Sequence, residues 1–216
     1  MIKHTQKKTS ADIIIAARKL FAEKGFSATS IREISSSANV NIASVNYHFK
    51  TKERLMYEVL KDGYQNLIEK IQTIPPKYQI DVTIFCVQVF RCFVEEKESI
   101  LNNMKIILSS EYLKMEDFGF SDETLGPPGA EMLLKVFEKS EAMTLTKTDA
   151  IWFVQTVFSM LFHKAIMVVS PMAMRPSARK LFSEKTVERH IRRTVDCLVE
   201  SLRYKYDQQI RSNDFF

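Results

Sequence analysis

Apolar residues near the start of the chain recur every three to four positions, which predicts an amphipathic helix. Thr9 and Asp12 resemble the capping pair of a helix that begins at Thr9 or Ser10. Gly25 follows Lys24, and glycine after a cation is typical of a helix end. The apolar side chains expected on one face of this helix are Ile13, Ala17, Leu20 and Phe21.

Two short helices are predicted next, separated by a tight turn. Ser30 and Glu33 form a capping box, so the second helix begins there and runs for about two turns. Asn39 lies where the chain must turn, and asparagine tolerates a left-handed backbone conformation better than most residues. Asn41 is expected to cap the third helix.

Longer helical patterns fill the remaining chain. Thr51 is expected to cap a fourth helix whose apolar stripe runs to Ile74 and stops at Pro75-Pro76. About 22 residues of helix span roughly 33 Å, enough to connect two domains. We expect loops at 116–129 and 170–183, and further helices at 78–97, 98–114, 129–142, 147–169 and 184–209. The predicted fold is all-α, with an N-terminal domain at 1–52 and a larger helical domain at 53–216.

Composition supports this assignment. The 216 residues are 45% hydrophobic and include only five glycines and six prolines, which favours helices over strands and turns. Three cysteines in apolar surroundings indicate core residues in a reducing compartment rather than disulfides. The apolar stretch 151–169 is interrupted by Gln155, His163 and Lys164, which favours a buried or dimerising helix over a membrane span. Without a secretion signal pattern, a cytoplasmic location is expected.

The charge is concentrated at the N-terminal end. Residues 1–50 contain eight Lys or Arg against three Asp or Glu, a net charge of +5, while the remaining residues contain 23 of each sign. A basic segment on a neutral body favours a polyanion-binding module, with a solvated basic tail as the alternative.

The segment 36–49, SSANVNIASVNYHF, contains no Lys, Arg, Asp or Glu. Val45 and Phe49 lie one turn apart and would pack inward, leaving a face of small and hydrogen-bonding side chains. Two short helices with a tight turn and a supporting helix describe a helix-turn-helix, whose second helix enters the DNA major groove. We expect contacts to DNA bases or phosphates from Thr29, Ser30, Asn41, Ile42, Ala43, Ser44, Asn46, Tyr47, His48, Lys50 and Lys52, with Lys3, Lys7 and Lys8 as a basic arm.

The stretch GFSATSIREISSSANVNIASVNYHFKTKERL, residues 25–55, resembles the N-terminal domain of TetR-type transcriptional regulators. The Gly-aromatic turn, capping box, recognition helix and Lys-Glu ending occur in the same order. Asn39 stands where that family commonly has glycine, Ala43 replaces a frequent glycine and Asn46 replaces a frequent tyrosine. The last difference suggests different operator contacts.

The resemblance implies a homodimeric regulator, a repressor released from a palindromic operator by a small effector that binds the C-terminal domain. It places the dimer interface on the last two long helices, with these candidates: Phe158, Phe162, Ala165, Ile191, Val195, Leu198 and Leu202. The alternative is that they are core residues of one chain. Aromatic and methionine side chains suit a largely apolar effector, with these candidates for its site: Phe90, Phe93, Asn103, Met104, Trp152, Gln155 and His163. The alternative for most of them is again ordinary core.

Two other functions are compatible with a helical chain of this composition. An enzyme is disfavoured because no HExxH, GxSxG, Walker or dinucleotide motif occurs and the four histidines are scattered. Cys86 and Cys92 are six residues apart, which is poor spacing for a shared metal ion, so no metal or cofactor is expected. The other possibility is a helical interaction module that keeps a DNA-binding domain without using it.

Overall fold

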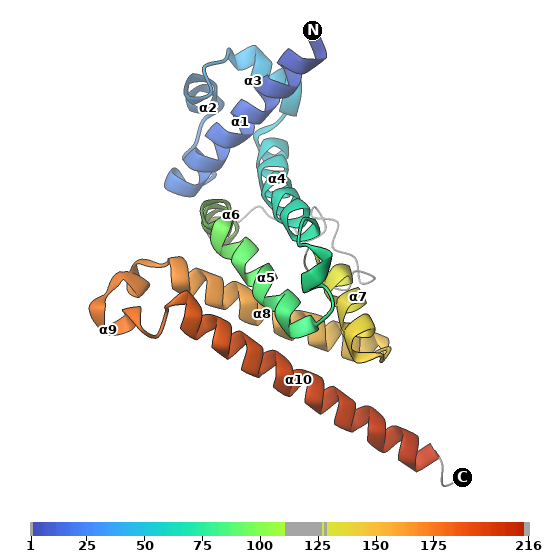
Figure 1. Cartoon of the computed structure of the whole chain (residues 1–216). Coiled ribbons are helices and arrows are strands. Elements are labelled where there is room, and N and C mark those ends of the chain that lie inside the picture. The colour runs from blue at the N-terminus through green and yellow to red at the C-terminus, as the bar shows by residue number, and fades with distance from the viewer. Residues whose placement is uncertain (1, 111–126, 128, 214–216) are drawn as a thin grey trace. The chain divides into compact units, whose positions relative to one another are not determined.

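The computed structural model describes residues 2–110, 127 and 129–213, and the side chains of residues 9–110, 127 and 129–210. Every regular element in these ranges is helical, which confirms the all-α fold (Figure 1). In the first part of the chain these are α1 (Ile2–Lys24), α2 (Ile31–Ser37), α3 (Ile42–Phe49) and α4 (Lys52–Gln72). The later elements are η1 (Pro76–Tyr78), α5 (Val82–Glu95), α6 (Lys97–Ser109), α7 (Ala130–Glu141), α8 (Lys147–Val169), η3 (Pro171–Met174), α9 (Pro176–Arg179) and α10 (Glu184–Asn213).

The predicted helix boundaries hold best where a side chain caps the helix. Helices α2, α3 and α8 begin directly after Ser30, Asn41 and Thr146, each of which accepts a hydrogen bond from the backbone three residues on. The first helix is longer than predicted: it begins at Ile2, since residues 2–9 contain no proline or glycine to stop it. Helix α5 begins later than predicted, because Asp81 caps it after η1.

The expected loop at 170–183 contains two short helical turns, η3 and α9, each starting at a proline. Most of the loop expected at 116–129 lies outside the described residues, as do residues 111–114 of the helix expected at 98–114.

The chain packs as two compact units. The first consists of residues 1–67 with the described part of 98–124, and the second of residues 68–97 with the described part of 125–216. Helix α6 therefore packs with the N-terminal helices although it follows α5 in sequence. The predicted division at residues 52 and 53 concerns functional domains, and it stays a prediction.

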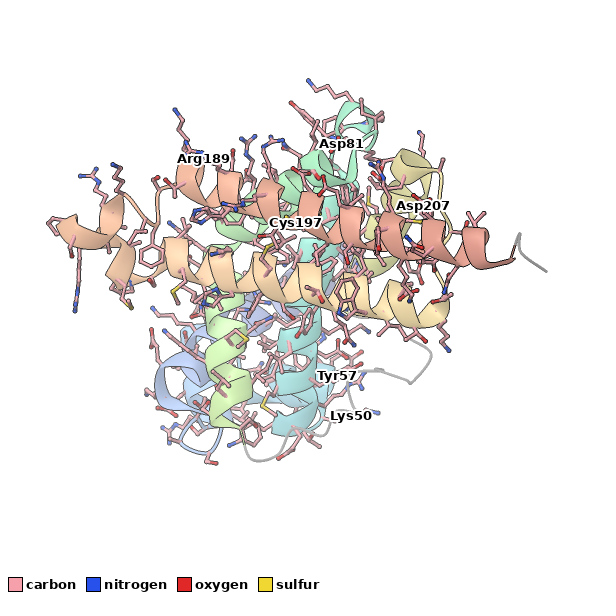
Figure 2. The ribbon with its side chains drawn as sticks, turned by 90° about the horizontal axis from the view of Figure 1, so that it is seen from below. Lys50, Tyr57, Asp81, Arg189, Cys197 and Asp207 are labelled. Carbon is pink, nitrogen blue, oxygen red and sulfur yellow. The ribbon has the colours of Figure 1, made fainter. Side chains whose placement is uncertain are left out.

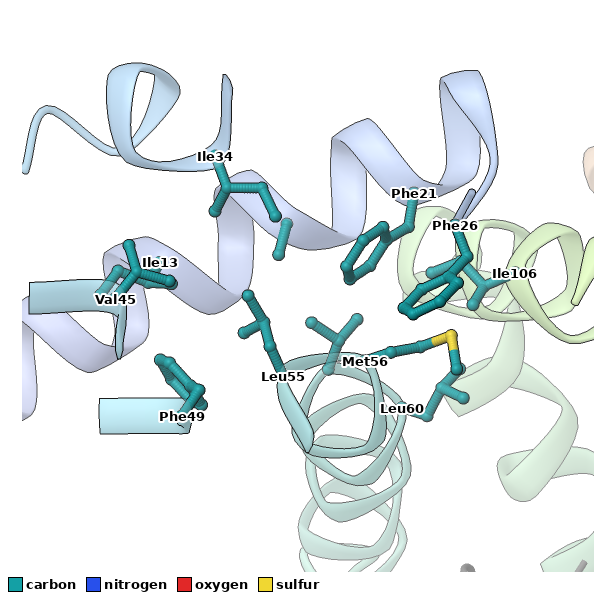
Figure 3. Close-up of a cluster of buried hydrophobic side chains, with 12 residues drawn as sticks. Ile13, Phe21, Phe26, Ile34, Val45, Phe49, Leu55, Met56, Leu60 and Ile106 are labelled. Atoms are coloured by element: carbon teal, nitrogen blue, oxygen red, sulfur yellow. The ribbon is translucent and has the colours of Figure 1, made fainter. Parts of the chain in front are cut away.

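One hydrophobic cluster holds the first unit together (Figure 3). Helix α1 contributes Ile13, Ala17 and Phe21, and α3 contributes Val45 and Phe49. Phe26, in the turn after α1, and side chains from α2, α4 and α6 complete it: Ile34, Leu55, Met56, Val59, Leu60 and Ile106. A buried side chain of this size stabilises the fold by about 1.5–3 kcal/mol relative to an exposed one, so this cluster fixes where the short helix α3 lies.

The second unit is built around α5, which packs against α7, α8 and α10. Buried side chains cover most of its surface, including Phe85, Phe90 and Phe93. Burial raises the pKa of the Cys86 thiol, and it raises that of Cys92 to about 11, in line with the core role predicted for both. Helix α8 is the one helix of the described chain that is long and apolar enough to cross a membrane, and 33% of its most apolar window is buried inside the chain.

Candidate nucleic-acid interface

Side-chain caps start both α2 and α3, the two helices on either side of the turn. Ser30 Oγ accepts a hydrogen bond from Glu33 N at 3.2 Å, and Glu33 Oε2 accepts one from Ser30 N at 2.9 Å. Asn39 has φ +53°, the left-handed conformation predicted for the turn. Asn41 Oδ1 then accepts from Ser44 N at 2.7 Å and from Ser44 Oγ at 2.9 Å, which starts α3.

Glu33 is also held in its charged form. Its carboxylate accepts a hydrogen bond from Lys24 Nζ at 2.6 Å in addition to the bond from Ser30 N. These hydrogen bonds, that of Lys24 first, lower the pKa of Glu33 to about 2. The start of α2 is therefore tied to the end of α1 at neutral pH.

Helix α3 has one buried and one open side. Val45 and Phe49 are 1% and 5% exposed and belong to the core of the first unit. At 100° per residue the opposite side carries Ala43 and Tyr47, with Asn46 next to Ala43. Ile42 lies between Asn46 and the buried Phe49 and is exposed as well. All four are exposed, Tyr47 by 72%, and none is charged. We call Ile42, Ala43, Asn46 and Tyr47 the outward face of α3.

The other polar residues predicted on this helix are partly engaged. Ser44 is half-buried, and its hydroxyl donates to Asn41. His48 is half-buried as well, with its ring centroid 5.3 Å from that of Tyr47 and 6.0 Å from that of Phe49. The contact with His48 orients the Tyr47 side chain, which remains exposed to solvent.

Thr29 was expected to contact DNA phosphates, but its surroundings leave it no route to a phosphate. It is 1% exposed, and its hydroxyl donates to the carbonyl oxygen of Gly25 at 2.8 Å. Thr29 therefore closes the turn between α1 and α2. Ser30, the neighbouring residue, is exposed and keeps the position expected of it.

Lys52 was also expected at phosphates, and in the structure it is bonded within the chain. Its Nζ donates to the carbonyl oxygens of Phe26 and Thr29, each at 2.9 Å, and lies 4.3 Å from the centroid of the Phe26 ring. Lys52 thus ties the start of α4 to the turn between α1 and α2. Lys52 is half-buried, and its ammonium group serves to stabilise the packing of the domain, a role that we call the brace.

Among the described side chains, Lys50 and Arg32 are the exposed cations nearest to α3 in sequence. Lys50 directly follows the helix and is exposed, with φ +61° (Figure 2). Arg32 on α2 is exposed too and was missed as a candidate, although the charge excess of residues 1–50 pointed to it. The side chains of Lys3, Lys7 and Lys8 lie outside the described residues, and their backbone is part of α1.

The residues predicted for effector binding fall into three groups. Phe90 and Phe93 are buried on α5. Asn103 and Met104 lie on α6 in the first unit, where Asn103 is 8% exposed. In contrast, α8 presents its predicted residues to solvent: Trp152, Gln155 and His163. Within neither unit do all seven residues line a single pocket.

Most residues predicted at the dimer interface are buried inside the single chain. Between 0% and 5% of each of these is exposed: Phe158, Ala165, Ile191, Val195 and Leu202. They form the packing of α8 and α10 on α5, so the alternative of an intramolecular core is correct for them. Phe162 and Leu198 are half-buried and remain within reach of a partner.

A second basic region lies in the second unit, hidden by the neutral total charge of residues 51–216. Residues 170–193 contain seven Lys or Arg against two Asp or Glu. All seven cations are exposed, and Arg91 pairs with the acidic Glu188 at 2.7 Å. The excess of positive charge is therefore present at both units, not only at the N-terminal end.

The segment that contains α2 and α3 matches a known domain in sequence. The profile described as "Bacterial regulatory proteins, tetR family" covers residues 13–59, from the middle of α1 into α4. A probable HTH-type transcriptional regulator, YttP of Bacillus subtilis (strain 168), is 43% identical over 65 residues, 30% of this chain and 31% of its own length. The HTH-type transcriptional repressor KstR2 of Mycolicibacterium smegmatis is 36% identical over 63 residues, 29% of this chain and 31% of its own. These alignments span less than a third of each relative.

Solved structures extend the similarity in fold to nearly the whole chain. A TetR-family regulator from Streptomyces coelicolor has 24% identity and a TM-score of 0.53, over 90% of this chain and 96% of its own. One from Rhodococcus sp. has 12% identity and a TM-score of 0.62, over 89% and 99%. At this identity they show a shared fold. The profile match and the helix-turn-helix geometry together identify residues 13–59 as a DNA-binding domain of the TetR type, and the solved structures show that the chain shares the fold of TetR-family regulators.

Proposed function

We propose that the protein is a sequence-specific DNA-binding transcriptional regulator, a repressor that acts from the cytoplasm without catalytic activity or a cofactor. The observation that carries this proposal is the outward face of α3: four exposed, uncharged side chains on a helix whose other side is anchored in a hydrophobic core. Such a face approaches base edges without leaving a buried charge. Ser30, Lys50 and Arg32 supply phosphate contacts around it. The repressor role follows the names of relatives such as KstR2.

A homodimer on a palindromic operator is part of this proposal. Helices α8 and α10 lie side by side, and Lys205 of α10 donates to Asp149 of α8 at 2.7 Å (Figures 1 and 2). One exposed stripe of α10 contains no Lys, Arg, Asp or Glu: His190, Thr194, Cys197, Ser201, Tyr204 and Gln208. On α8 the exposed residues Trp152, Gln155, Ser159 and His163 continue this pattern. Core positions of interfaces are depleted in charge, so these stripes suit a second copy of the chain.

The dimer is tested by placing a charge in the stripe. Ser201→Arg is expected to shift the molar mass measured by light scattering after size exclusion toward the monomer, because a buried, unpaired charge opposes association. Glu200→Arg changes the adjacent residue on the charged side of α10 and is expected to leave the dimer intact. Equal effects of both variants would place the interface elsewhere.

The effector is proposed to be small and largely apolar, with one polar group. Buried polar atoms lie close together on α6: Asn103 Oδ1 and Ser99 Oγ have no hydrogen-bond partner among the described residues. An unsatisfied buried acceptor is costly, and a ligand donor would satisfy it. Asn103→Leu, which keeps the volume and removes the amide, is expected to abolish the rise in melting temperature that amphiphilic compounds produce. A library of such compounds that never raises the melting temperature of the native chain would contradict the effector proposal.

The regulator itself is tested by selecting bound genomic DNA fragments with the purified chain. One palindrome is expected, with half-sites about one helical turn apart. Tyr47→Ala and Lys50→Ala should weaken it, since both residues are exposed, Tyr47 on α3 and Lys50 directly after it. Arg192→Glu in the basic region of α10 is the control and should leave it unchanged. Binding that is salt-sensitive but blind to sequence, and that falls with Arg192→Glu alone, would contradict the proposal.

A further inference from the structure

We propose that the half-site read by α3 consists of A·T base pairs at the positions that the helix contacts, with Asn46 as the residue that selects adenine. This inference rests on the proposed function, because it concerns the bases read by the same helix. It depends on which hydrogen-bonding groups of α3 are already used within the chain and which remain free.

Asn46 is the amide of α3 that is free to read a base. It is exposed, and within the described part of the chain its side chain has no hydrogen-bond partner. Asn41 is also exposed, but its Oδ1 is occupied by Ser44 N and Ser44 Oγ. Only an asparagine with both its oxygen and its nitrogen free can bond N6 and N7 of adenine together.

Ile42 lies one turn before Asn46, and Ala43 lies beside it on the outward face. Their side chains offer methyl groups, which match the C5-methyl group of thymine. Four residues of helix advance about 6 Å, between one and two base-pair steps of about 3.4 Å. Ile42 and Asn46 are thus spaced to contact base pairs that lie one or two steps apart.

The outward face lacks the side chains that most often recognise G·C pairs. Guanine is most often recognised by Arg or Lys on O6 and N7, and cytosine by an acidic side chain on N4. Residues 34–49 contain no Lys, Arg, Asp or Glu, and the cations nearest in sequence, Arg32 and Lys50, lie outside α3. Tyr47 carries a single hydroxyl, which donates and accepts and therefore discriminates weakly between bases. The side chains present thus favour adenine and thymine.

The experiment is a selection from a random duplex library with the full-length chain, followed by competition binding. The native chain is expected to enrich a palindrome with an adenine at one symmetric position of each half-site. Replacing that A·T pair by G·C should lower its affinity about 5- to 150-fold, the range for one bidentate contact. Asn46→Arg should enrich the same palindrome with guanine at that position. Asn46→Ala should lose the preference there and keep it at the other positions.

Gln72→Arg is the matched control, since it adds the same charge at an exposed position at the end of α4. It is expected to enrich the native sequence. A palindrome that has G·C at the contacted positions, or whose bases do not change with Asn46→Arg, would overturn the adenine assignment while leaving the regulator intact. Sequence-blind binding by the native chain would overturn both the adenine assignment and the proposed regulator. The selection with the native chain alone already shows that outcome, so the two failures are distinguishable.

Discussion

Lys52→Met tests whether this lysine braces the domain or binds phosphate. The change removes the ammonium group and keeps a side chain of similar length. Lys52 Nζ donates two hydrogen bonds of 2.9 Å, to the carbonyl oxygens of Phe26 and Thr29, and lies 4.3 Å from the Phe26 ring centroid. A hydrogen bond to a charged group contributes about 1.5–3 kcal/mol, and a cation–π contact at an exposed site about 0.5–1 kcal/mol. Because Lys52 is half-buried and water competes for its ammonium group, we expect a loss of about 2–3 kcal/mol.

The assay must report on the first unit alone. The single tryptophan, Trp152, lies in the second unit, so its fluorescence does not report on the contacts of Lys52. Hydrogen exchange of the amides between residues 25 and 37 reports on the stability of the segment that these contacts hold. A loss of about 2–3 kcal/mol raises the opening equilibrium there about 30- to 140-fold. Lys50→Met removes the same charge from an exposed position and is expected to leave exchange unchanged.

DNA titrations then separate the two roles. Lys50→Met is expected to reduce the slope of log affinity against log salt by about 0.9, the value for one lost phosphate contact. Lys52→Met should leave that slope unchanged at a temperature where the domain stays folded. If Lys52→Met showed native hydrogen exchange together with a slope reduced by about one, the brace assignment would be refuted and Lys52 would be a phosphate ligand.

Three further predictions concern the packing around this domain. Gly63→Ala would place a Cβ 2.2 Å from Asn103 Nδ2. Because overpacking costs about 1–3 kcal/mol and alanine gains only about 1 kcal/mol of helix propensity, the variant should be less stable than the native chain and should regain stability when Asn103→Ala is added. Unfolding followed by circular dichroism measures this, and native stability of the single variant would contradict it. The pKa of Glu33 is lowered to about 2, so its ionised form stabilises the fold above pH 4.5, the pKa of this carboxyl in the unfolded chain, and this stabilisation is lost as pH falls toward 2. The melting temperatures of the native chain and Glu33→Gln should therefore differ most near pH 6 and converge toward pH 2. A difference that stays constant with pH would argue against the ion pair. Thr29→Val removes the bond to Gly25 O and should cost about 1–2 kcal/mol of stability while leaving the salt slope of DNA binding unchanged, whereas a reduced slope would restore Thr29 as a phosphate contact.

Features that depend on neighbours in sequence were predictable. The capping box of Ser30 with Glu33, the left-handed Asn39 and the Asn41 cap each involve groups within three or four positions, and all three occur as predicted. Local sequence therefore located α3 and its buried side chains Val45 and Phe49. The early start of α1 was missed because a good capping residue at Thr9 does not end a helix that can continue.

Roles that depend on distant partners were not predictable. The carbonyl oxygens bonded by Lys52 belong to residues 23 and 26 positions earlier, and Thr29 turned out to be buried. A lysine or threonine near a helix start looks the same in sequence whether it faces solvent or the chain. Only the packing of α1, α2 and α4 around one core decided which of the polar residues were left for DNA.

The same distinction holds for the two long helices of the second unit. The sequence alone determined that α8 and α10 are helices with wide apolar faces, because periodicity and capping are local properties. It did not determine which apolar residues serve the chain itself, since a side chain is buried only when other elements cover it. Tertiary structure placed Phe158 and Ile191 in the core and left the stripe from His190 to Gln208 exposed, because α5 packs against one side of these helices and not the other.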